Sequence, residues 1–128
     1  MNKVRVERVR RVRTLQERLA QAATARARQG EEDARALVER VEGLRADLGN
    51  ADGVVGADAL KGRAALRERL LGLQQVALRQ VAQAEGVTAE RQRAEQARTR
   101  EVRRIERLAS RQVEAEQPVE LFGQRRTW

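Results

Sequence analysis

Gly49-Asn50-Ala51-Asp52-Gly53-Val54-Val55-Gly56 separates two long segments in which apolar residues recur every three or four positions. Glycine, asparagine and aspartate tolerate the left-handed and turn conformations that a helix interior excludes. The stretch therefore predicts a bend over residues 49–58. On either side of it we expect one long helix, over about residues 3–48 and about residues 59–116.

The segment before the bend has the spacing of a coiled-coil seam. Steps of three and four residues place side chains in one stripe along a helix. Three steps of four in succession between Leu15 and Ala27 indicate a stutter, a local relaxation of the left-handed supercoil. The predicted seam positions are Val12, Leu15, Leu19, Ala23, Ala27, Gly30, Ala34, Leu37, Val41, Leu44 and Leu48.

The segment after the bend continues the pattern, with a weak stretch in its middle. We expect this helix to end before Pro118, because the residue that precedes a proline is pushed out of the helical region. Residues 117–128 are predicted to form a flexible tail; its aromatic residues, Phe122 and Trp128, leave open a short anchor in a partner's groove. The predicted seam positions are Leu66, Leu70, Leu73, Ala77, Val81, Ala84, Val87, Arg91, Ala94, Arg98, Val102, Ile105 and Leu108.

Folding the two segments about the bend sets Leu44 against Leu66 and Val6 against Val102. Apolar stretches of the two helices then meet each other. The predicted fold is all-α, with two long helices in an antiparallel coiled-coil hairpin.

The composition excludes several kinds of chemistry. Charged residues make up 36% of the chain and aromatic residues 2%, which is typical of exposed helices with a narrow buried stripe. Without cysteine or histidine, the chain lacks the groups for disulfides, thiolate or imidazole metal sites and Ser-His or Cys-His catalysis. We therefore expect no enzyme activity, cofactor, metal or small-molecule substrate. No apolar run is long enough for a membrane span, so we expect a cytoplasmic protein.

The net charge of +8 is spread unevenly along the chain. Residues 1–28 hold nine basic and two acidic side chains, whereas residues 29–58 hold three basic and eight acidic ones. The hairpin would therefore be basic where its termini meet and acidic on the first helix near the bend. Such a basic end could neutralise phosphates. However, acidic residues interrupt it and neither predicted helix offers an aromatic ring for base stacking, so we favour protein over nucleic acid as the partner.

The second predicted helix is more apolar near its start than its seam requires. Leu71, Val76 and Leu78 fall off the predicted stripe, and Leu71 and Leu78 share a face because they are seven residues apart. A broadened seam or a third helix from another copy would explain the surplus. The alternative is a docking face for a different protein.

Two stretches resemble the FliJ family of flagellar export stalks and its injectisome counterparts of the YscO type. They are Val4-Arg5-Val6-Glu7-Arg8-Val9 and Glu95-Gln96-Ala97-Arg98-Thr99-Arg100-Glu101-Val102-Arg103-Arg104-Ile105-Glu106-Arg107-Leu108, on either side of a glycine-containing bend. The resemblance covers residues 4 to about 112. The chain departs from the family in its tail, which is shorter than the charged extension usual there.

This resemblance implies a central stalk of a type III export apparatus. Such a protein would be monomeric outside the complex and peripherally attached at the inner membrane. Its partners would be a hexameric export ATPase, a membrane export-gate protein and substrate chaperones. Leu71, Val76 and Leu78 would contact the gate or a chaperone. The residues expected to contact the ATPase are Arg5, Arg8, Arg10, Arg13, Arg103, Arg104 and Arg107.

Two other functions stay open beside the stalk. One is a self-associating structural or scaffold coiled coil, which should form higher assemblies in solution. The other, less favoured, is a basic helical protein that binds nucleic acid, with Lys3, Arg11 and Arg111 adding to the basic surface.

Overall fold

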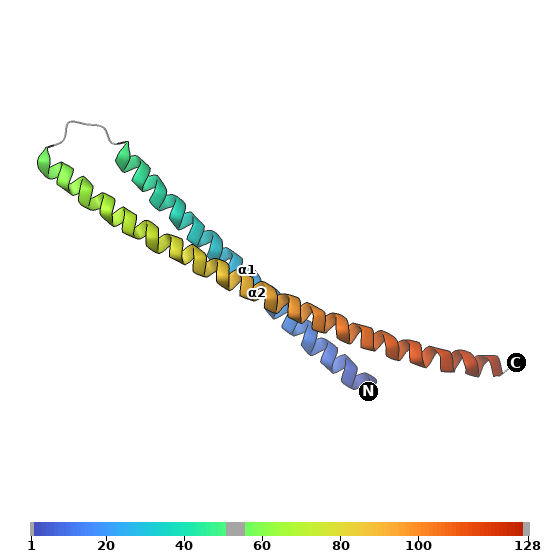
Figure 1. Cartoon of the computed structure of the whole chain (residues 1–128). Coiled ribbons are helices and arrows are strands. Elements are labelled where there is room, and N and C mark those ends of the chain that lie inside the picture. The colour runs from blue at the N-terminus through green and yellow to red at the C-terminus, as the bar shows by residue number, and fades with distance from the viewer. Residues whose placement is uncertain (1, 51–55, 127–128) are drawn as a thin grey trace. The chain divides into compact units, whose positions relative to one another are not determined.

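The computed structural model describes residues 2–50 and 56–126, with side chains for residues 2–50 and 56–115. It contains two helices, α1 at Lys3–Gly49 and α2 at Ala57–Arg126, and no strand within the described residues. The two helices run in opposite directions and pack against each other (Figure 1). The prediction of an all-α antiparallel hairpin is confirmed. Most of the predicted bend, residues 51–55, lies outside the described residues.

The N-termini of both helices are capped. The backbone carbonyl of Asn2 accepts the first helical hydrogen bond from Val6 at 3.1 Å, and its side-chain oxygen accepts from the amide of Val4 at 3.2 Å. Asn2 is therefore the N-cap of α1. At the start of α2 the carbonyl of Gly56 accepts from the amide of Leu60, and Asp58 lies in the first turn, where a carboxylate complements the helix dipole.

The chain divides into two compact units, each made from both helices. Unit 1 combines Met1–Thr24 with Arg91–Trp128, and unit 2 is Ala25–Glu90. In unit 1, Arg13 pairs with Glu101 and Gln16 pairs with Arg98, so the helices are antiparallel there. In unit 2 the same direction follows from the pairs Arg35 with Glu85 and Arg45 with Gln74.

One row of the buried face of α1 follows a heptad. Every seventh residue from Val6 to Leu48 is buried or half-buried, namely Val6, Arg13, Ala20, Ala27, Ala34, Val41 and Leu48. The predicted seam matches this set at Ala27, Ala34, Val41 and Leu48. It is wrong at Val12, Leu15 and Leu19, which are more than half exposed, and at Gly30, Leu37 and Leu44, which are exposed as well. The stutter between Leu15 and Ala27 stays a prediction.

The buried face of α2 is equally thin. Leu70, Ala77, Val102 and Ile105 are buried, as predicted, and Thr88 joins them. The predicted seam positions Leu66, Leu73, Val87, Arg91, Ala94 and Leu108 are exposed instead. These residues flank the stripe that α1 covers, and one neighbouring helix is too narrow to cover the flanks as well.

The pairing of the helices is shifted from the predicted register. Leu44 was expected to face Leu66, but the next residue, Arg45, hydrogen-bonds Gln74 in unit 2, and both leucines are about half exposed. The register therefore does not follow from folding the two helices symmetrically about residue 54. Val6 and Val102, the other predicted pair, are both buried in unit 1. However, Arg13 pairs with Glu101 there, so the register of unit 1 is shifted as well.

The predicted end of the second helix before Pro118 is wrong, because α2 continues to Arg126. A proline removes one hydrogen bond and crowds one turn, and helical geometry can persist on both sides of that turn. The segment expected to be a flexible tail is thus helical from residue 117 to residue 126, and it includes Phe122. Residues 127 and 128 lie outside the described residues.

Candidate protein-binding surfaces

Half-buried polar side chains link the two helices in the middle of unit 1. One Nη atom of Arg13 donates to Glu101 Oε2 at 2.9 Å and to Gln16 Oε1 at 3.3 Å. One Nη atom of Arg98 donates to the same two oxygens, at 3.2 Å each. Two guanidinium groups therefore share two acceptors, in a stretch of seam that lacks large apolar residues. We call Arg13, Gln16, Arg98 and Glu101 the polar cluster.

Of the seven arginines predicted to contact the ATPase, all in unit 1, Arg13 is committed to the polar cluster. Arg10 lies 3.9 Å from Glu7, a long and exposed ion pair, and lines a shallow groove with Glu106 and Glu114 of α2. The acids of α2 therefore temper the positive charge around Arg10. The other five arginines are exposed and make no ion pair with a described side chain: Arg5, Arg8, Arg103, Arg104 and Arg107.

The arginines of α2 in this set face away from α1. Val102 and Ile105 are buried against α1, and each residue turns the helix by about 100°. Arg103, Arg104 and Arg107 therefore lie on the outer side of α2. These three arginines form an exposed surface of their own, and the seven predicted arginines do not form one patch.

The three predicted apolar contact residues of unit 2 are all about half exposed: Leu71 at 45%, Val76 at 48% and Leu78 at 50%. They do not share one face. Leu71 and Leu78 each follow a buried residue, Leu70 and Ala77, and so lie on one side of the stripe. Val76 precedes Ala77 and lies on the other side, with Leu73.

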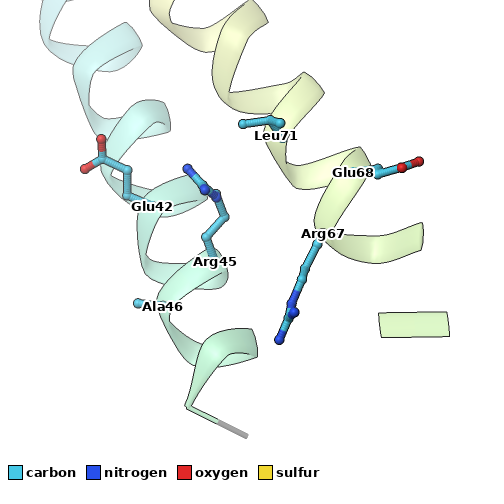
Figure 2. Close-up of a pocket in the computed structure, with 6 residues that line it drawn as sticks. All are labelled: Glu42, Arg45, Ala46, Arg67, Glu68 and Leu71. Carbon is cyan, nitrogen blue, oxygen red and sulfur yellow. The ribbon is translucent and has the colours of Figure 1, made fainter. Parts of the chain in front are cut away.

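Leu71 also lines a shallow groove between the helices of unit 2. The other lining residues are Glu42, Arg45 and Ala46 of α1 and Arg67 and Glu68 of α2. Leu71 points toward α1, whereas Glu68 points away from it (Figure 2). The groove combines two apolar side chains, Leu71 and Ala46, with charges of both signs, which is typical of a protein contact and not of an enclosed ligand pocket.

A second groove, in unit 1, contains none of the predicted contact residues. Gln16, Leu19, Ala20 and Ala23 of α1 line it on one side, and Arg91, Ala94 and Arg98 of α2 on the other. Sequence reasoning missed it because Leu19 and Ala94 were placed in the buried seam. The heptad from Val6 through Val41 to Leu48, followed at strict intervals of seven, would have left Leu19 outside.

No family model, curated protein or solved structure matches this chain. The described part of the chain contains no group of three or more acidic, histidine or cysteine residues that could bind a metal ion. Neither helix, over the residues described, contains a segment long and apolar enough to cross a membrane. The candidate surfaces consist mainly of exposed arginines and leucines.

Proposed function

We propose that this chain is the central-stalk component of a type III protein export apparatus, coupling the export ATPase to the export gate and chaperones through protein contacts. The proposal rests on the antiparallel hairpin with contact groups on its outside, together with the sequence resemblance to the FliJ and YscO family. In this role the protein is cytoplasmic and peripheral to the inner-membrane export apparatus. It has no catalytic residues of its own.

A stalk held by a ring of subunits needs a helical rod whose outer side chains are free for the ring. The observation that carries the proposal is the outer surface of α2 in unit 1. Arg103, Arg104 and Arg107 are exposed and make no ion pair with a described side chain. Charged residues at such a contact steer association and orient the partners more than they add affinity.

The ATPase contact is tested by charge reversal. The variant R103E/R104E/R107E should retain its helicity and lose most of its binding to the purified export ATPase in a pull-down. The matched control is R40E/R69E/R79E, which reverses the same amount of charge at exposed arginines of unit 2. Equal binding of both variants and the unmodified chain would remove the ATPase assignment.

The gate contact is tested on the Leu71 side of unit 2. The variant L71S/L78S should keep its helical circular dichroism, because both residues are about half exposed, and should bind the export-gate protein more weakly. L37S/L44S provides a control with exposed leucines on α1. A loss of helicity in L71S/L78S would instead place the two leucines in a core.

One observation favours the second candidate function, a self-associating scaffold. Large apolar residues flank the seam on both helices of unit 2, including Leu37, Leu44, Leu66 and Leu73, at 37% to 54% exposure. A second hairpin could cover them in a four-helix arrangement. Sedimentation velocity separates the two functions, since the stalk should remain a monomer at micromolar concentration and the scaffold should form higher assemblies.

A further inference from the structure

An apolar stripe remains uncovered on α1 in unit 1. Val12, Leu15 and Leu19 are 54%, 58% and 59% exposed, and they occur at i, i+3 and i+7, so they share one side of the helix. The adjacent heptad positions Arg13 and Ala20 face α2 in their place. This is the spacing by which one helix presents a seam to another, although α1 already uses a different seam for α2.

The stripe opens into the groove between the helices of unit 1. Leu19 forms part of the wall, and three alanines, Ala20, Ala23 and Ala94, lie along the lining. Small side chains let the backbone of another helix approach closely. The groove and the stripe together therefore fit a third helix lying alongside α1 and α2.

Arginines border this surface on both sides. Arg11 and Arg18 are exposed, seven residues apart, and lie on the side of the stripe away from α2. Arg91 and Arg98 of α2 line the opposite side. No acidic residue lines the groove, and among the described residues only Arg98 of these four has an ion-pair partner. In coiled coils, charges that flank the apolar seam select the partner's charges.

We propose that the surface formed by Val12, Leu15, Leu19 and the adjoining groove binds an amphipathic helix of another protein, with an apolar stripe flanked by acidic residues. A second copy using the same stripe would set Arg11 and Arg18 against their own counterparts, and the resulting repulsion disfavours that occupant. The proposal does not rest on the stalk function, because it needs neither an ATPase nor an export gate.

The test uses the full chain and a panel of fluorescein-labelled designed peptides of four heptads. Each carries leucine and alanine along one face and glutamate on both flanks, and a matched set carries lysine at the flanks. Fluorescence anisotropy should show saturable binding of the glutamate peptides and not of the lysine peptides. The variant L15Q/L19Q, whose substituted side chains are exposed, should weaken binding by about tenfold or more, as expected for two central apolar contacts.

Charge reversal provides the specificity arm. The variant R11E/R18E/R91E should no longer bind the glutamate peptides and should bind the lysine peptides instead. The control R40E/R69E/R79E should bind both sets as the unmodified chain does. Circular dichroism of each variant reports whether the hairpin is intact. The proposal is overturned if glutamate and lysine peptides bind alike, or if L15Q/L19Q binds unchanged. It is also overturned if the leucines are instead required for dimerisation in sedimentation or for binding to vesicles of phosphatidylglycerol.

Discussion

A guanidinium nitrogen of Arg13 on α1 lies 2.9 Å from a carboxylate oxygen of Glu101 on α2, and the same oxygen accepts from Arg98 at 3.2 Å. The side chains of Arg13 and Glu101 are 39% and 37% exposed, so water screens the pair only in part. Glu101 also separates two positive charges that would otherwise meet in the seam. The carboxylate therefore matters more here than in an isolated surface ion pair.

Replacement of Glu101 by alanine should lower the free energy of unfolding by about 1 kcal/mol, at the upper end for exposed pairs, because Arg13 and Arg98 then repel each other. Urea unfolding followed by circular dichroism at 222 nm measures the change. In 1 M salt the difference should shrink, since screening weakens partly exposed charges. E7A is the control, because the Glu7 to Arg10 distance is 3.9 Å and both side chains are about half exposed. An effect of E7A as large as that of E101A would contradict the prediction.

Interior glycines weaken both helices without a packing role. Gly30, Gly43, Gly62, Gly72 and Gly86 are exposed, and a β-carbon built at each meets no atom within 4 Å. None of the described glycines has a positive φ. Alanine should therefore stabilise the chain by about 1 kcal/mol at each site, through helix propensity.

The measurement is the urea midpoint of G30A, of G72A and of the double variant. The two sites are far apart in sequence and share no described partner, so their effects should add to within about 0.5 kcal/mol. A midpoint that falls in either single variant would mean that the glycine makes a close contact in solution.

The helices could be predicted from the sequence because the evidence for them is local. Alanine and leucine favour helix along both segments, and the glycine-rich stretch at residues 49–56 separates them. The identity of the buried face could not be predicted so well. Two parallel stripes exist on α1, one through Val12, Leu15 and Leu19 and one through Arg13, Gln16 and Ala20. An apolar count selects the first, whereas the structure buries the second.

The buried face of α1 could not be predicted because it depends on which side chains of α2 lie opposite it. The second stripe places Arg13 and Gln16 where Arg98 and Glu101 can bond them, and those partners are known only once the register is known. The sequence predicts the register only by symmetry about the bend, and the cross-helix bonds show a different register. The candidate site shows the same dependence. The sequence places Leu71, Val76 and Leu78 off the seam but leaves a broadened seam open, whereas in the structure all three are exposed and Val76 lies on the other side of the stripe.

Two threonines occupy core positions, Thr24 in unit 1 at 2% exposure and Thr88 in unit 2 at 6%. Their hydroxyls donate to the carbonyls of Ala20 and Ala84 in the preceding turn, at 3.1 and 2.9 Å. These carbonyls also take part in the helical ladder, so loss of the hydroxyl leaves no buried group unpaired.

Valine at either position should therefore be neutral or stabilising, by up to about 0.8 kcal/mol for the buried methyl group. Serine, which removes a methyl and keeps the hydroxyl, should destabilise by about 1 kcal/mol. Thermal and urea unfolding of T24V, T24S, T88V and T88S give the comparison. If the valine variants lose more stability than the serine variants, the hydroxyls have partners beyond their own helix.

Pro118 lies inside α2 rather than beyond its end, so it should weaken the helix at this point. A proline inside a helix leaves the carbonyl four residues earlier, that of Glu114, without its usual donor and costs about 3 kcal/mol relative to alanine. P118A should therefore raise the mean helicity at 222 nm and slow hydrogen exchange of the backbone amides of residues 119–126.

P118G is the control, because it restores the amide donor but adds backbone freedom, and it should protect these amides less than alanine does. Exchange that stays unchanged in P118A would show that the proline does not limit the helix at this point. An alanine variant that protects residues 119–126 and leaves residues 91–112 unchanged would localise the effect to the end of α2, because the packing at Val102 and Ile105 does not depend on that turn.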